Sequence, residues 1–330
     1  MPIQPDRGNR YGISWREVLT TLAPEKSTSP SPIEIIRLLM RHGRQNFARS
    51  ACDELVAAQM LMPRDLLVLS DQCKSRGDLD HWAFYRRRAY EIEMFSLGLR
   101  DQKHAESVQY CLASDGVCDQ HPSPPESYLR ALFDQYSDTF EQRLIGELEY
   151  RGPQEVYRIV TSHRELKLSG ARILDAGCGT GLAGPLFRPH ATRLDGLDLS
   201  PAMIDRARER DVYAELIVGD VVNSIRNSNS HYDLVLAIDL LVYIGDLSVV
   251  FKAIASNLGA GGWVAASIEQ GEAGYQHKDH RRYLHSLDYV RDVSMTAGLK
   301  MVCTEATSLR KERGKPVDFH VALFTMASVE

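Results

Sequence analysis

The chain has 330 residues, of which 44% are hydrophobic and 25% are charged. This length and composition indicate a folded globular protein of about two domains and exclude a disordered or fibrous one. A formal net charge of −5 argues against a general nucleic-acid binder, which normally carries a basic surface.

The cysteines and the apolar segments bear on the cell compartment. Six cysteines are scattered along the chain without a CxxC pair or another metal-ligand spacing, which predicts reduced thiols and no metal site. The first ten residues, MPIQPDRGNR, are polar, and no apolar run approaches the roughly 20 residues of a membrane helix. We therefore expect a cytoplasmic protein with neither a membrane nor a nucleic acid as partner.

Residues 1–121 are predicted to form an all-helical domain. Connectors rich in proline and serine lie at Pro24–Pro32 and at His121–Ser127. Between them, four segments carry apolar residues at helical spacing: IEIIRLLMRHG, ARSACDELVAAQMLM, RDLLVLSDQCKSRG and LDHWAFYRRRAYEIEMF. The second connector separates this helical half from a chemically different one.

A weak internal repeat runs through these helices. Gly43 and Gly77 lie 34 positions apart, each between two predicted helices, and this is the period of tetratricopeptide repeats. Ala48 and Ala89 stand where that repeat has small residues, whereas Trp82 occupies another such place. Two degenerate copies are fewer than the three or more of a self-supporting array, so a plain helical bundle is an equal alternative.

Residues 122–330 are predicted to form an α/β domain. After the amphipathic segment PESYLRALFDQYSDTFEQRLIGEL, strands are expected at ARILDA, TRLDGLD, AELIVGD, YDLVLAI and GGWVAASI. Helices are expected after Gly181, from Pro201 to Arg210 and over LSVVFKAIASNL. Near-continuous apolar strands separated by helices indicate a parallel sheet covered on both faces. The adjacent strands KMVCTEATSL and DFHVALFTMA predict a final antiparallel hairpin.

A glycine turn follows the first of these strands, in the sequence DAGCGTG from Asp175 to Gly181. No lysine follows Gly181, which disfavours a triphosphate-binding loop, and the DxGxGxG spacing fits the dinucleotide pattern GxGxxG poorly. Asp198 ends the next strand, 23 residues after Asp175, where a carboxylate accepts hydrogen bonds from ribose hydroxyls. Asp220 ends the third strand, placed to accept from an adenine amino group, and Met203 is placed to pack on the adenine face.

These stretches resemble a known family. ILDAGCGTG, GLDLSPAMIDRA, VGD and YDLVLAIDLLVYIGDL look like the successive motifs of class I S-adenosylmethionine-dependent methyltransferases, over Ser127 to the C-terminus. SYLRALFDQYSDTFEQRL, LLVYIGDL, RRYLHSLDYVRDVSMTAGLK and LRKERGKPV are similar to the bacterial branch with N-terminal tetratricopeptide-like repeats. The N-terminal half matches that branch only in being helical and loosely repetitive. The resemblance implies a seven-stranded Rossmann-like sheet with an antiparallel terminal hairpin.

The resemblance also implies a cofactor, S-adenosylmethionine, with S-adenosylhomocysteine as product. Carried over position by position, it assigns the methionine part to Asp175 and the backbone of Gly177, Cys178 and Gly179, and the ribose to Asp198. It assigns the adenine surroundings to Leu199, Met203, Asp220 and Val221, and the amino acid end to the backbone of Ile238. Tyr136 and Phe140, in the segment before the sheet, are expected to close the pocket.

Methyl transfer needs an aligned nucleophile, and a base only where the nucleophile must lose a proton. The acceptor side should come from residues 239–245 and 269–286, where DLLVY replaces the NPPY tetrapeptide of nucleobase and glutamine-amide methylation. His285 is the candidate general base, with a structural hydrogen-bond donor as the alternative. Glu269 follows the fifth strand and either faces the cleft or is a solvated loop carboxylate.

Two tyrosines and a run of charged residues complete the candidate acceptor side. Tyr243 and Tyr283 either shape the acceptor pocket or are half-buried core residues. His277, Lys278, His280 and Arg281 are interpreted as a solvated, mobile lid. Arg281 and Arg282 either pair with an acceptor carboxylate or form a surface charge run.

Three functional hypotheses follow. The first is methyl transfer from S-adenosylmethionine to a small molecule, with an amino-acid-like acceptor as one candidate, at oxygen, nitrogen or sulfur. The second is a protein or peptide methyltransferase that recruits its target through the helical domain. The third is a non-catalytic cofactor-binding scaffold whose helical domain binds partners or self-associates. The glycine turn and the three acidic positions argue against the third.

Overall fold

The computed structural model describes residues 14–22, 30–117, 124–228, 230–278 and 281–327. The chain divides into two compact units, Met1–Ser96 and Leu97–Glu330. This division lies before the predicted boundary at residues 121 and 122, because helix α6 (Asp101–Ser114) belongs with the second unit. The Tyr110 hydroxyl of α6 donates to the Arg281 carbonyl oxygen at 3.0 Å.

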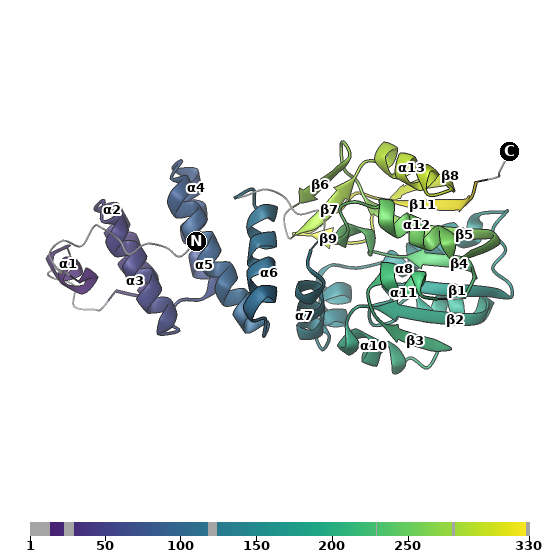
Figure 1. Ribbon diagram of the computed structural model, residues 1–330, viewed down its shortest axis with the longest axis horizontal. Helices are drawn as coiled ribbons and strands as arrows, with labels where there is room; N and C mark the ends of the chain where they lie inside the picture. The colour runs from purple at the N-terminus through teal and green to yellow at the C-terminus, as the bar shows by residue number, and fades with distance from the viewer. Residues whose placement is uncertain (1–13, 23–29, 118–123, 229, 279–280, 328–330) are drawn as a thin grey trace. The chain divides into compact units, whose positions relative to one another are not determined.

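The first unit is helical over its described residues, as predicted. Its helices are α1 (Trp15–Leu22), α2 (Pro32–Arg41), α3 (Gln45–Ala57), α4 (Pro63–Ser75) and α5 (Leu79–Ser96) (Figure 1). Gly43 and Gly77 have φ of 68° and 74°, which explains a glycine at the end of α2 and of α4. Ala48 and Ala89 are fully buried. The tetratricopeptide-like repeat stays a prediction.

The second unit is built on a seven-stranded sheet with the order β3-β2-β1-β4-β5-β11-β8. Its strands are β1 (Ala171–Ala176), β2 (Ala191–Asp198), β3 (Glu215–Val218), β4 (Tyr232–Ala237), β5 (Leu258–Glu269), β8 (Leu299–Thr307) and β11 (Phe319–Met326). The first five pair in parallel, whereas β11 is antiparallel to both β5 and β8. Figure 1 shows β3 at the lower and β8 at the upper edge. The predicted fold, with its antiparallel end, is confirmed.

Helices cover both faces of this sheet, because successive strand residues point to opposite sides. Leu174 and Val235 face the core formed with α11 (Val221–Arg226), α12 (Ser248–Ser256) and α13 (Leu287–Thr296). Ile173 and Leu234 face the core formed with α8 (Gly152–Ser162) and α9 (Gly184–Phe187). Both kinds of position are buried, which accounts for the near-continuous apolar strands.

The segments around the sheet carry the remaining elements. These are α7 (Glu126–Tyr136), the π-helical turn η1 (Gln142–Glu147), the 3₁₀ turns η2 (Arg188–His190) and η3 (Leu241–Tyr243), and α10 (Pro201–Arg208). Two small hairpins follow β5 in sequence: β6 (Tyr275–Lys278) with β7 (Arg282–His285), and β9 (Lys311–Glu312) with β10 (Lys315–Pro316). No helix within the described part of the chain is long and apolar enough to cross a membrane.

The β6–β7 hairpin corrects the prediction of a solvated loop over this segment. His277 and Lys278 lie in β6, and Tyr283 and His285 lie in β7, where they are paired across the two strands. His280, which belonged to the predicted lid, lies outside the described residues. The side chains of this segment are mostly polar, so its sequence lacks the apolar run that predicts a strand.

Candidate functional site

A pocket lies at the carboxyl ends of β1, β2, β3 and β4, where parallel sheets of this kind hold ligands. Ten of the eleven residues predicted to hold the cofactor line it: Asp175, Gly177, Cys178, Gly179, Asp198, Leu199, Met203, Asp220, Val221 and Ile238. The eleventh, Tyr136, does not line this pocket. This residue is 36% exposed, and its ring centroid lies 5.2 Å from the guanidinium carbon of Arg143. Phe140, expected beside it, does line the pocket.

The glycine turn after β1 forms the floor of the pocket. Gly177 and Gly179 have φ of 73° and 54°, a left-handed conformation that residues with a Cβ rarely adopt. The N–H groups of Gly177 and Cys178 donate to the Leu197 carbonyl oxygen at 2.7 and 3.0 Å. A Cβ on Gly177 would lie 3.0 Å from Leu240. The turn is therefore fixed to the end of β2, with its backbone facing the pocket.

Asp175 is a buried carboxylate at the end of β1, only 2% exposed. Its Oδ2 accepts a hydrogen bond from the Tyr213 hydroxyl at 2.7 Å. Burial raises the pKa of Asp175 to about 6, and the nearby charge of Asp198 adds to this rise. A carboxylate held in this way gains most from a cationic ligand, because such a ligand would offset the cost of its buried charge.

Asp198, at the end of β2, is held by backbone donors. Its Oδ2 accepts from the Gly179 N–H and its Oδ1 from the Ser200 N–H, both at 2.9 Å. Burial raises the pKa of Asp198, while these backbone hydrogen bonds act in the opposite direction. Each carboxylate oxygen has a second lone pair, so the group can still accept from ligand hydroxyls.

The start of α10 fixes the neighbouring wall. The Ser200 hydroxyl accepts from the Met203 N–H at 3.1 Å, which caps the helix, and donates to Asp134 of α7 at 2.5 Å. Met203 is 1% exposed and lines the pocket. On the opposite wall, the Asp220 carboxylate caps α11 by accepting from the Asn223 N–H at 2.9 Å. Helix α7 is thus tied to the same loop that holds Asp198.

The residues at this end fit an adenosyl cofactor. The pocket has one buried carboxylate that favours a cation, two further carboxylates for hydroxyl or amino donors, and the glycine turn where a backbone approaches closely. Thr180 adds a buried hydroxyl that has no hydrogen-bond partner within the described residues. These carboxylates, the Thr180 hydroxyl and the glycine turn together match a ligand with an ammonium group, ribose hydroxyls and an adenine ring.

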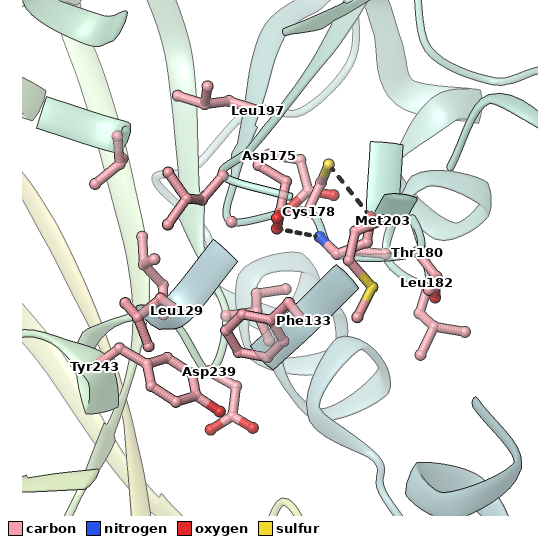
Figure 2. Close-up of a pocket in the computed structure, with 18 of the residues that line it drawn as sticks. Leu129, Phe133, Asp175, Cys178, Thr180, Leu182, Leu197, Met203, Asp239 and Tyr243 are labelled. Carbon is pink, nitrogen blue, oxygen red and sulfur yellow. Dashed lines mark hydrogen bonds between the residues drawn. The ribbon is translucent and has the colours of Figure 1, made fainter. Parts of the chain in front are cut away.

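The other end of the pocket is largely aromatic. Phe133 of α7 meets the Tyr243 ring edge-on at 5.3 Å and the Phe140 ring at 6.3 Å. Figure 2 shows Tyr243 and Asp239 at this end, Phe133 and Leu129 beside them, and Asp175 with Cys178 at the far end. Leu144 and Tyr150 complete the wall. We refer below to Leu129, Phe133, Phe140, Leu144, Tyr150 and Tyr243 as the aromatic end.

A buried ion network lies behind the aromatic end. The guanidinium of Arg310, 1% exposed, donates to both carboxylate oxygens of Asp239 at 2.6 and 2.8 Å and to Glu269 at 2.7 Å. The second Glu269 oxygen accepts from Lys278 at 2.6 Å, and the same ammonium lies 3.4 Å from Glu312. Asp239 lines the pocket with φ of 55°, so its strained backbone is held by a paired side chain.

Of the four residues predicted to be catalytic, one lines the pocket and three do not. Tyr243 lines it, whereas Glu269, Tyr283 and His285 are not among its lining residues. Glu269 is 1% exposed and fully paired, so it is not a solvated loop carboxylate. Tyr283 is 1% exposed and packs against His277, with ring centroids 4.2 Å apart.

His285 has a structural position. It is fully buried, and its Nε2 donates to the carbonyl oxygens of Ile244 and Gly245 at 2.9 and 3.1 Å. Burial lowers the pKa of His285 to about 4, so the imidazole is neutral at physiological pH. It anchors β7 to the loop that carries Tyr243. In the same hairpin, Arg282 pairs with Glu312 at 2.8 Å.

Several residues of the site could not be predicted from sequence motifs. Phe133 and Leu129 lie on α7, whose apolar spacing predicts a helix and does not by itself indicate a site. Tyr150 stands in a short connection, and Tyr213 and Arg310 carry no local motif. The spacing of α7 contains a usable signal, since Leu129 and Phe133 are four residues apart and therefore share one face.

Comparisons with known proteins show similarity to methyltransferases. Residues 144–297 match the family model described as a methyltransferase domain. The Xanthomonas euvesicatoria ubiquinone biosynthesis O-methyltransferase is 31% identical over 101 residues, covering 29% of this chain and 42% of that protein. The Bos taurus 18S rRNA (guanine-N(7))-methyltransferase is 28% identical over 120 residues, covering 29% of this chain and 43% of that protein. The chain spans less than half the length of these curated relatives.

A solved structure shares the fold. The Burkholderia thailandensis 1,6-didemethyltoxoflavin-N1-methyltransferase, with bound 1,6-didemethyltoxoflavin and S-adenosylhomocysteine, superposes with a TM-score of 0.50 at 14% identity. The alignment covers 64% of this chain and 94% of that one. The second unit therefore has the strand order of this fold, and its residues 144–297 are similar to methyltransferase domains.

Proposed function

We propose that this protein transfers a methyl group from S-adenosylmethionine to a small-molecule acceptor. The observation that carries the proposal is the convergence of Asp175, Asp198 and Asp220 with the glycine turn on one pocket. When bound, the cofactor would supply a methyl group on a sulfonium; transfer breaks its carbon–sulfur bond, forms the acceptor–methyl bond and leaves S-adenosylhomocysteine.

Each side chain at the cofactor end has a role in this proposal. Asp175 would pair with the ammonium group of the cofactor, and Tyr213 fixes that carboxylate through its hydroxyl. Asp198 would accept from the ribose hydroxyls while its backbone donors hold it in place. Asp220 and Met203 would contact the adenine. The protein's contribution is chiefly to bind and align the reactants.

The walls of the pocket beyond the cofactor end support a small acceptor. Beyond the cofactor end, the pocket is walled by α7, the η1 turn and η3, and its lining there includes Asp239 together with the residues of the aromatic end (Figure 2). One relative in sequence is named as a ubiquinone biosynthesis O-methyltransferase, and the solved structure with this fold is named as a 1,6-didemethyltoxoflavin-N1-methyltransferase.

Isothermal titration with S-adenosylhomocysteine tests the cofactor part. The wild-type protein and an Asp205→Ala control, altered on the exposed surface of α10, should bind alike. Asp198→Ala should lose at least tenfold in affinity, since a hydrogen bond to a charged group contributes roughly 1.5–3 kcal/mol. Circular dichroism would establish that the variant is folded. Unchanged affinity in folded Asp198→Ala would refute the assigned ribose contact.

Transfer from methyl-labelled S-adenosylmethionine tests the reaction. Incubation with a cell extract separated into small-molecule and protein fractions should place the label in the small-molecule fraction. Label confined to the protein fraction would instead support a protein methyltransferase, and binding without label in either fraction would support a scaffold.

A further inference from the structure

Two tyrosine hydroxyls stand out at the aromatic end. Tyr150 and Tyr243 both line the pocket, and neither hydroxyl is hydrogen-bonded to another residue of the described chain. Burial raises the pKa of both phenols, so each hydroxyl keeps its proton at physiological pH. Each can therefore donate a hydrogen bond to a ligand and cannot act as a ready base.

The position of Tyr150 is fixed by its local structure. Its N–H donates to the Leu144 carbonyl oxygen at 2.9 Å, and the next residue, Arg151, donates to the Leu309 carbonyl oxygen at 2.7 Å. The Tyr150 ring then folds over Gly152, where a Cβ would overlap its hydroxyl and ring carbons. The glycine thus permits this ring to lie against the start of α8 and to line the pocket.

The position of Tyr243 is fixed from two sides. It ends η3, where its N–H donates to the Leu240 carbonyl oxygen at 3.1 Å. Its ring meets Phe133 edge-on. The charges of Asp239 and Arg310 act on the hydroxyls of both tyrosines, which places the two phenols in one electrostatic environment.

The charged groups next to this end are already paired. Asp239 is held by both N–H groups of one Arg310 nitrogen, and Glu269 is shared between Arg310 and Lys278. The other lining residues of the aromatic end are Leu129, Phe133, Phe140 and Leu144. A charged acceptor group would be desolvated here without a free counter-charge among the residues that the structure describes, and such burial is strongly unfavourable.

We propose that the hydroxyls of Tyr150 and Tyr243 form a hydrogen-bonding pair that positions an uncharged, largely apolar acceptor. The inference rests on the proposed methyltransferase function and adds the class of acceptor. It selects against an amino-acid-like acceptor, whose ammonium and carboxylate groups would both need partners. The acceptor presents a hydrogen-bond-accepting atom to the two phenols and its apolar body to the aromatic end.

The test compares three probes with one ring: p-cresol (neutral), tyramine (cationic) and 4-hydroxyphenylacetate (anionic). Binding of each is measured by titration calorimetry on protein saturated with S-adenosylhomocysteine. We expect p-cresol to bind at least tenfold more tightly than either charged probe. Equal or tighter binding of a charged probe, or no saturable binding of p-cresol up to millimolar concentration, would overturn the proposal.

Matched variants assign the effect to the two hydroxyls. Tyr150→Phe and Tyr243→Phe should each weaken p-cresol binding about fivefold and leave S-adenosylhomocysteine affinity unchanged, since each removes one hydrogen bond. The control is Tyr275→Phe, which changes a 38% exposed tyrosine outside the pocket. Unaltered p-cresol affinity in both pocket variants would overturn the proposal. Failure of the wild type to bind S-adenosylhomocysteine would instead refute the proposed function.

Discussion

Asp175 couples cofactor binding to the stability of the free protein, and Asp175→Asn separates the two. The carboxylate is 2% exposed, and burial raises its pKa from an ordinary 3.8 to about 6. The native state therefore favours the protonated form, and its stability falls as pH rises from about 4 through about 6. A difference of about two pKa units corresponds to ~3 kcal/mol at neutral pH.

Asparagine at this position keeps an oxygen that can accept from the Tyr213 hydroxyl but carries no charge. We therefore expect the variant to be more stable than the wild type by ~1.5 kcal/mol at pH 5 and ~3 kcal/mol at pH 7. Urea unfolding without ligand, followed by circular dichroism at several pH values, measures the difference. The control is Asp292→Asn on the exposed surface of α13, which should show no such trend.

The same variant should bind S-adenosylhomocysteine at least tenfold more weakly, because it lacks the charge that pairs with the ammonium group. An unfolding free energy that is equal for the two proteins at pH 7, or a difference that does not grow between pH 5 and pH 7, would refute the assigned burial of this charge. Stabilisation without loss of ligand affinity would refute its role in binding.

Two further variants test the turn and the ion network. Gly177→Ala should destabilise the protein by ~1–3 kcal/mol and abolish S-adenosylhomocysteine binding, because the added Cβ meets both a left-handed backbone and Leu240. Gly116 has a similar φ with open space around it, so Gly116→Ala should cost only the backbone strain. Equal costs for the two variants would contradict the close contact between the turn and Leu240. Arg310→Met should cost ~3–5 kcal/mol in urea unfolding, because it removes the cation paired with Asp239 and leaves Glu269 with Lys278 as its remaining partner. The exposed Arg291→Met should cost less than ~1 kcal/mol. A cost for Arg310→Met as small as that of the control would show that the buried network is not formed.

The fold could be predicted from the sequence because its main signals are local. Strands buried on both faces give continuous apolar runs, and the turn after Asp175 gives a short glycine pattern. The β6–β7 hairpin was not predicted, because His277 and Lys278 lie among polar residues that carry no apolar alternation.

The cofactor end and the aromatic end of the pocket also differ in how far they could be predicted from the sequence. Asp175 and Asp198 lie in the last two residues of β1 and β2, and Asp220 follows β3 at the start of α11, so topology alone brings the three together. Tyr150, Tyr243 and Arg310 come from separate connections. Only tertiary packing brings the two tyrosines into one pocket and pairs Arg310 with Asp239, another of its lining residues. His285 was predicted as a base from its type, and its carbonyl partners in the loop after β4 became visible only in the folded chain.

The pH dependence of S-adenosylhomocysteine binding to the wild-type protein tests the central claim most directly. Because the pKa of Asp175 is about 6 in the free protein, the carboxyl must lose its proton before it can pair with the ligand's ammonium group. The association constant should be level above about pH 6.5 and fall by up to about tenfold per unit as pH drops from 6 towards 4. Absence of binding at neutral pH, or an affinity unchanged between pH 7 and pH 5, would contradict the account.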